Sequence, residues 1–285
     1  MNTTAQIGGS SSRLTRGRAV ALIAVAALCA LGLWLGPKLW MLVRSTDRFV
    51  VWAAEPGVRF EPGAETMAGE VAATLRGAVR MVEQRLGQPF LSPPAVFVCA
   101  KLATYKSYVG NATSGGCVIN RRLFLSPKPQ NTAERIPQLL AHELTHLHVA
   151  QRLSLARAMR LPFWFNEGLA VFVSDGGGAE NVTVPEARQA IADGRVFVPE
   201  GNRAFFWRKG PAAYHLPAHL FYREAGMFVF DIAMRERERF PAFIKRIEKG
   251  ELPDAAYRAE YGETMAAAWA RFVGGIKAAP APIAH

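Results

Sequence analysis

Two histidines and a glutamate interrupt an otherwise apolar segment near the middle of the chain. They belong to the run His142-Glu143-Leu144-Thr145-His146, and the apolar residues around this run predict a helix over residues 136–153. A helix brings residues four positions apart to one face, so both imidazoles can reach one metal ion. Because polar groups are costly to bury without a partner, we expect a metal centre at this helix.

The glutamate inside the run suits a different role from the histidines. The Glu143 carboxylate can reach a water molecule on the ion and take its proton without binding the ion itself. This division of roles is the physical content of the H-E-x-x-H motif of zinc hydrolases. The motif alone also arises by chance, so its interpretation depends on finding a third ligand.

Zinc in a catalytic site needs a third protein ligand and an open fourth position. In the metzincin arrangement, a glycine and a third histidine would stand where this chain has Val149 and Arg152, so that arrangement is excluded. A second predicted helix, over residues 165–174, offers a glutamate instead. Glu167 is the only acidic residue between Glu143 and Asp175, and we therefore expect it to be the third ligand.

At this point the chain resembles the gluzincin metallopeptidases. His-Glu-Leu-Thr-His is the string of thermolysin, and Asn166-Glu-Gly-x-Ala170 is similar to the third-ligand motif of membrane alanyl aminopeptidases and of peptidase-MA-like domains. The resemblance implies one Zn²⁺ per chain on His142, His146 and Glu167, and Glu143 as general base. It also implies a zincin-like fold of two lobes with the site between them, and hydrolysis of peptide bonds.

The same resemblance implies a tyrosine that stabilises the oxyanion. Tyr222 fits the family pattern, with Tyr214 and His219 as alternatives. Two departures limit the resemblance: the Gly-x-Met-Glu-Asn motif of aminopeptidases is absent, and Val171 stands where thermolysin has an aspartate that supports a ligand. Aminopeptidase specificity is therefore in doubt, and support for the ligands must come from elsewhere.

The order of predicted elements favours an α+β fold, because strands with one long helix precede a run of helices. We expect a small N-terminal lobe of sheet and helix and a helical C-terminal lobe, within one domain over residues 45–277. Residues 278–285 form a flexible tail. The predicted helices cover residues 64–86, 102–109, 136–153, 165–174, 184–193, 216–238, 240–248 and 264–277, and the predicted strands cover residues 47–53, 95–99, 117–119 and 122–125.

The N-terminus predicts a membrane anchor. Residues 1–18 are basic and free of acids, and residues 19–43 are apolar for a length that can span a bilayer. A cleaved signal peptide is the alternative. Positive charges flank the segment almost equally, but the acid-free start favours a cytoplasmic tail and an extracytoplasmic domain.

Export would permit a disulfide between Cys99 and Cys117, with two buried free thiols as the alternative. The net charge of +11 is dispersed, and no nucleic-acid motif is present, so we expect no nucleic-acid partner. Besides peptide hydrolysis, two functions stay open: a non-catalytic binding or scaffold domain at the cell envelope, and a zinc hydrolase of another amide or an ester. The oligomeric state is not indicated.

Overall fold

The computed structural model describes residues 36, 41, 43–128, 131–200 and 209–278. The chain divides into two compact units, residues 1–45 and residues 46–285, and the elements below belong to the second. No helix among the described residues has the length and apolar character to cross a bilayer. The predicted cytoplasmic tail over residues 1–18 and nearly all of the predicted anchor over residues 19–43 lie outside the described residues, as do residues 279–285.

Within the described residues, one mixed sheet has five strands in the order β1-β2-β3-β5-β4. In that order the strands are Val50–Val51, Val58–Phe60, Val96–Val98, Arg122–Leu125 and Gly116–Ile119. The three inner strands are parallel, and each outermost strand is antiparallel to its neighbour. β4 and β5 form a hairpin whose turn residues, Asn120 and Arg121, have φ of 47° and 58°. Positive φ at both residues is what a two-residue turn needs in order to match the twist of the two strands.

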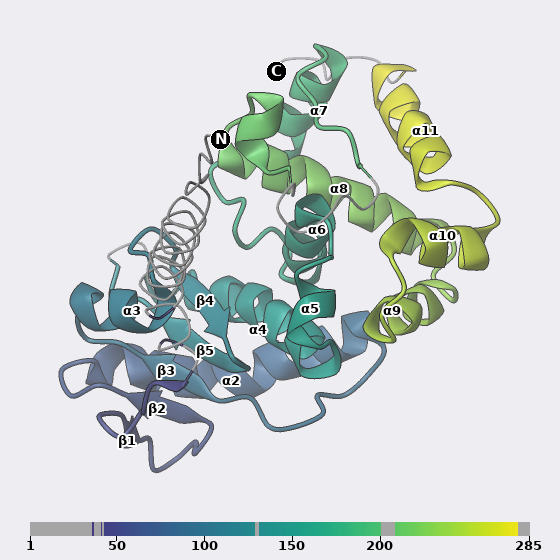
Figure 1. Cartoon of the computed structure of the whole chain (residues 1–285). Coiled ribbons are helices and arrows are strands. Elements are labelled where there is room, and N and C mark those ends of the chain that lie inside the picture. Colours follow the sequence, from purple (N-terminus) through teal and green to yellow (C-terminus); the bar gives the residue numbers. More distant parts are fainter. Residues whose placement is uncertain (1–35, 37–40, 42, 129–130, 201–208, 279–285) are drawn as a thin grey trace, which may run out of the picture. The chain divides into compact units, whose positions relative to one another are not determined.

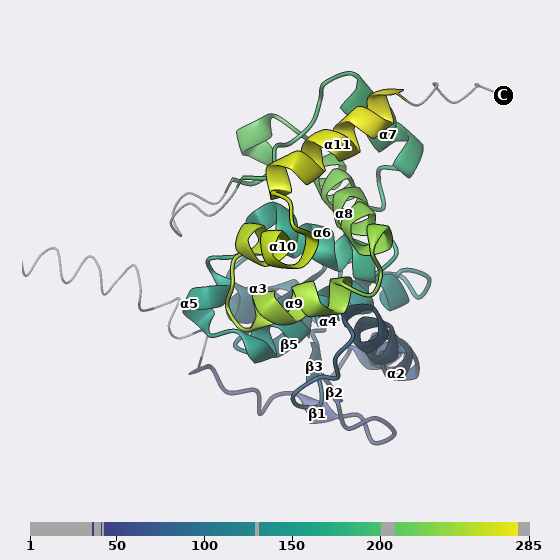
Figure 2. The same cartoon turned by 90° about the vertical axis from the view of Figure 1, so that its right-hand side faces the viewer.

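The helices are α2 (Glu65–Leu86), α3 (Leu102–Val109), α4 (Ile136–Arg152), α5 (Leu155–Ala158), α6 (Phe163–Val173), α7 (Val184–Ala192), α8 (Ala218–Arg235), α9 (Phe240–Glu248), α10 (Pro253–Tyr261) and α11 (Met265–Ala278), with a short 3-10 helix, η2, at Pro211–Tyr214. Figure 1 shows α4 between the sheet and α6. Figure 2 shows α9, α10 and α11 grouped near α6 and α8.

Successive side chains along each strand point to opposite faces of the sheet, and each face contributes to a different hydrophobic core. Val96 and Val98 of β3 join the main core, which also contains buried residues of α2, α4, α6 and α8. Phe97 points to the opposite face and stacks on Phe124 at a centroid distance of 5.0 Å. The sheet therefore packs against α2 and α4 on one face and against α3 on the other.

The predicted α+β class is confirmed. Residues 102–109, 122–125 and 240–248 form the expected elements with the expected bounds, and the other predicted helices differ only at their ends. Helix α10 was not expected; its buried residues are Pro253, Ala256 and Tyr257. The first strand is shorter than predicted and covers only Val50–Val51.

The expected disulfide between Cys99 and Cys117 is wrong, because both residues are free thiols. Cys99 follows β3 and Cys117 lies in β4, with β5 between these strands. Two strand spacings amount to about 10 Å, whereas a disulfide needs Cα atoms within about 7 Å of each other. Burial raises the pKa of each thiol to about 12, so neither is a reactive thiolate near neutral pH.

Candidate metal centre

Helix α4 presents the two histidines of the motif to the same space. His142 and His146 are one helical turn apart, and their Nε2 atoms lie 3.2 Å from each other. Their side chains are 7% and 16% exposed, so both are largely buried and His146 is the more accessible of the two. The helical spacing that predicted a shared ligand site is therefore present in three dimensions.

Helix α6 returns across α4 and supplies the carboxylate. The Glu167 Oε2 atom lies 3.5 Å from His142 Nε2 and 3.8 Å from His146 Nε2. Among the described residues, these three side chains form the one group of histidine, cysteine or acidic residues with the geometry to hold a metal ion. The structure thus brings together the residues that the sequence nominated as metal ligands.

Charge inside the site favours a bound cation. Burial would lower the pKa of His142, but the hydrogen bond to Glu167 and the charges of Glu143 and Glu167 outweigh burial and raise this pKa to about 9. Burial would raise the pKa of Glu167, yet the two histidines hold it below its ordinary value. The carboxylates therefore stabilise positive charge between the imidazoles, which is where a metal ion would sit.

A backbone carbonyl orients the first histidine. The His142 Nδ1 atom lies 2.8 Å from the carbonyl oxygen of Gly177, and because a carbonyl only accepts, Nδ1 donates. This leaves the Nε2 lone pair free to face a metal ion. Gly177 lies in the turn that follows α6, so this turn provides the ligand support that Val171 cannot provide.

The turn around Gly177 requires glycine. A Cβ on Gly177 would lie 2.7 Å from the Gln138 carbonyl oxygen of α4, and one on Gly178 would lie 2.6 Å from His142 Cε1. Gly176 and Gly178 also have positive φ, 101° and 82°, in the region that favours glycine. The glycine run over residues 176–178 is therefore part of the wall of the site.

Glu143 lies beside the cluster and against the edge of the sheet. A Cβ on Gly116 of β4 would meet the Glu143 carboxyl carbon at 2.9 Å, so only glycine allows the strand to pass so close. Burial raises the pKa of Glu143 to about 7; His142 lowers this pKa and Glu167 raises it further. A carboxyl group with a pKa near neutrality is suited to take up and release a proton.

Tyr222 of α8 lies near enough to the site to interact with the charges of its carboxylates. Its pKa is raised to about 12, first by burial and then by the negative charges of Glu167 and Glu143. The phenol is therefore protonated at neutral pH and lies within electrostatic range of both carboxylates. A protonated phenol in this position can donate a hydrogen bond to a substrate oxygen.

The alternatives to Tyr222 have other contacts. The Tyr214 hydroxyl donates to the Val198 carbonyl at 2.8 Å. His219 lies 3.8 Å from a Glu180 carboxylate oxygen and accepts from the Asn181 backbone N–H. His215 ends η2 with φ of 55° and joins no metal-binding group within the described residues.

His148, two residues after His146 on α4, has a structural role. It is fully buried, lies 3.1 Å from a Glu248 carboxylate oxygen and contacts the Gln88 carbonyl at 3.0 Å. The same carboxylate pairs with Arg152 at 3.2 Å. This buried network ties the end of α4 to α9 and to the segment after α2.

Two glycines allow α6 and α8 to pack closely enough to place Glu167 and Tyr222 in one site. A Cβ on Gly168 would lie 2.6 Å from the Ala225 carbonyl oxygen, and one on Gly226 would lie 2.9 Å from Val171 Cβ. The Val171 side chain therefore fills the space left by the missing side chain of Gly226, so Val171 has a packing role.

Sequence reasoning found the candidate metal-ligating side chains but missed three residues beside them: Gly116, Gly177 and Gly178. Their contribution is backbone or empty space, so no chemical pattern marks them. The nearest signals are the Gly115-Gly116 pair and the Gly176–Gly178 run, each of which also fits an ordinary turn.

Comparison of the chain with models of known protein families found no match, and comparison with curated proteins found none either.

Proposed function

We propose that this chain is a zinc-dependent metallopeptidase of the gluzincin type. The observation that carries the proposal is the convergence of His142, His146 and Glu167, with Glu143 beside them in a buried position where it is not needed as a ligand. A buried carboxyl group without a structural partner is costly, and general-base catalysis accounts for its presence. A purely structural metal site would not need Glu143.

Zinc is the metal that best suits these donors. Two imidazole nitrogens and one carboxylate oxygen, with a fourth position open, form a typical catalytic zinc set. With metal–ligand bonds of about 2.05 Å, a tetrahedral site separates its ligand atoms by about 3.4 Å. The three separations here are 3.2, 3.5 and 3.8 Å, so the donors can close around zinc with shifts of a few tenths of an ångström.

Zinc, when bound, would supply a Lewis acid that polarises the scissile carbonyl and acidifies water. Glu143 accepts the proton of the attacking water and delivers it to the leaving amine. Tyr222 donates a hydrogen bond to the carbonyl oxygen as negative charge develops there. Gly177 keeps the His142 ring in one tautomer and orientation throughout.

A peptide is the substrate class that the sheet favours. β4 is the outermost strand next to β5, and Gly116 of β4 lies against Glu143. An extended peptide can add to such an edge through main-chain hydrogen bonds. A scissile bond held in this way would lie close to the Glu143 carboxylate.

We further propose a zincin-like arrangement, with the sheet, α2 and α4 as one lobe and the helices from α6 onward as the other. Residues 19–43 would anchor the chain in a membrane, with the catalytic domain on the extracytoplasmic side. The free thiols lend this location no support, so it depends on the apolar segment over residues 19–43 and on the basic, acid-free residues 1–18.

The test compares the full chain with Glu143→Gln and with the exposed control Glu238→Gln, using an unbiased peptide library with and without added zinc. We expect wild type and the control to cleave peptides, and Glu143→Gln to keep zinc but lose activity by about 10²–10⁴-fold. A zinc-loaded, folded wild type that cleaves no peptide would reject the peptidase assignment. Cleavage of non-peptide amides or esters in the same screen would instead favour the other hydrolase function.

A further inference from the structure

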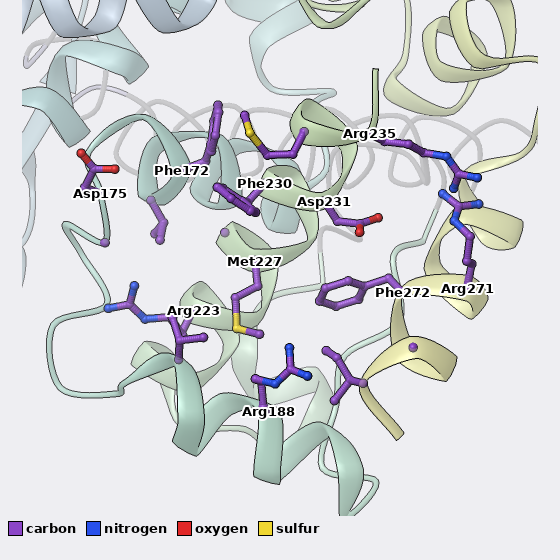
Figure 3. A pocket seen from close by; sticks show the side chains of 17 residues that line it. Phe172, Asp175, Arg188, Arg223, Met227, Phe230, Asp231, Arg235, Arg271 and Phe272 are labelled. Carbon is purple, nitrogen blue, oxygen red and sulfur yellow. The ribbon is translucent and has the colours of Figure 1, made fainter. Parts of the chain in front are cut away.

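A cavity of about 930 Å³ lies among α6, α7, α8 and α11 (Figure 3). None of the residues that line it is a metal-binding residue of the candidate site, and neither Glu143 nor Tyr222 is among them. Its volume falls within the range of about 300–1,000 Å³ that is usual for small-molecule sites. The cavity is therefore a candidate for a ligand that the proposed peptidase chemistry does not use.

The cavity has an apolar interior that reaches the surface. Phe172, Met227, Phe230 and Phe272 line it, and Phe230 is 54% exposed although it is a large apolar residue. Surface apolar groups that continue into a concave site are typical of binding sites. The helices that form the walls offer no strand edge, so extended-peptide addition is not suited to this cavity.

Most charged groups around the cavity already have partners. Arg271 and Arg235 pair with Glu263, at 2.7 and 3.6 Å. Asp175 pairs with Arg85 at 2.7 Å. Asp231 lies on the same part of the wall as Arg235 and Arg271 in Figure 3. These groups balance one another locally and leave little net charge for a ligand.

Two arginines lie on another part of the wall and differ in their contacts. Arg223 donates to the carbonyls of Val182 and Ala179, at 2.8 and 3.0 Å. Arg188 has no ion pair or hydrogen bond among the described residues, and its side chain extends into the cavity beside Met227 in Figure 3. Within the described part of its wall, the cavity thus combines an apolar floor with the Arg188 guanidinium, which has neither an ion pair nor a hydrogen bond there.

We propose that this cavity binds a long-chain carboxylate, with the carboxylate on Arg188 and the hydrocarbon chain along Met227, Phe230 and Phe272. A planar guanidinium matches a carboxylate in both charge and geometry. Among the described wall residues, Arg188 is the arginine without an ion pair or hydrogen bond, and its place at the end of an apolar cavity fits a ligand with one anionic head and one chain. The ligand would also lie next to Gly176, the neighbour of the residue that orients His142.

The experiment uses the purified full chain and a photoreactive palmitate analogue with a diazirine in its chain. Peptide mass spectrometry locates the crosslinks, and unlabelled palmitate, hexadecanol and anionic phospholipid vesicles serve as competitors. We expect crosslinks on α8 and α11, with palmitate competing better than hexadecanol. The proposal is overturned if crosslinks map elsewhere, if hexadecanol competes as well as palmitate, or if only vesicles compete.

Three variants sharpen the test. Arg188→Ala should weaken palmitate competition by about tenfold and leave hexadecanol unchanged, whereas Arg237→Ala, another exposed arginine, should change neither. Met227→Glu places a charge in the apolar floor and should abolish labelling. Since Arg188 is exposed, its replacement should leave the denaturation midpoint unchanged, so loss of labelling cannot be ascribed to unfolding. Equal palmitate affinity in Arg188→Ala and Arg237→Ala would overturn the proposed head-group contact.

Discussion

Gly178 is the position where one added methyl group should damage the metal centre most selectively. Its φ is +82°, and a Cβ there would lie 2.6 Å from His142 Cε1 and 2.9 Å from His142 Nδ1. Comfortable carbon–carbon contact needs about 3.5–4.0 Å, so in Gly178→Ala the imidazole must move by about 1 Å. Metal sites tolerate displacements of only about 0.5 Å.

Gly194 provides a matched control. Its φ is +81°, and no atom lies within 4 Å of the corresponding Cβ position. Both alanine variants carry the left-handed backbone penalty of about 1–2 kcal/mol, which denaturant unfolding of the full chain would measure. Only Gly178→Ala should also lose metal affinity, by about 10–100-fold, the range for losing support of a ligand.

The assay is a zinc titration of both variants and wild type against a chromophoric chelator. The expected result is wild-type affinity for Gly194→Ala and the predicted loss for Gly178→Ala. If Gly178→Ala binds zinc as tightly as Gly194→Ala, the glycine turn does not hold His142, and the proposed support of this ligand is refuted.

Three further predictions concern α8 and its neighbours. Burial raises the pKa of Glu224 from 4.5 to about 8, so this carboxyl ionises at lower pH in the unfolded chain, and the unfolding free energy of wild type should fall by at most about 5 kcal/mol as pH rises between these values. Denaturant titrations at pH 5 and pH 8 should show that Glu224→Gln lacks this loss. An equal change in unfolding free energy between the two pH values in wild type and Glu224→Gln would contradict the assignment. Gly226→Ala should lower the unfolding free energy by about 1–3 kcal/mol through overpacking. Gly77→Ala, in open space on α2, should raise the unfolding free energy by about 0.5–1 kcal/mol. A change of the same sign in both variants would refute the close packing of α6 against α8 at Gly226. Tyr222→Phe should lower kcat about 10²-fold with KM little changed, and Tyr214→Phe should leave both constants unchanged; the reverse pattern in peptide cleavage would exclude Tyr222 as the oxyanion donor.

Local patterns predicted most of the helices and the three side chains of the candidate metal site. Residues 136–152 form a helix because their apolar period is strong, and His142 and His146 then share a face by helix geometry alone. Glu167 could be nominated because no other acid competes for its place in that stretch. These inferences needed only spacing along the chain and the donor chemistry of zinc.

Features that depend on strand order or on packing between distant segments could not be predicted in this way. The disulfide prediction failed because β5 lies between β3 and β4, although it follows both in sequence. The Gly177 carbonyl and the space at Gly116 leave no side-chain signature. The cavity likewise requires the joint placement of α6, α7, α8 and α11, which no single segment encodes.

The metal content of the purified full chain tests the central claim most directly. Elemental analysis together with X-ray absorption should find one zinc per chain, with two histidine nitrogens and one carboxylate oxygen as protein ligands. Glu167→Gln should retain the fold and lose affinity or the carboxylate ligand. A folded wild-type chain that takes up no zinc when incubated with it, or one whose zinc environment is unchanged by Glu167→Gln, would contradict this account.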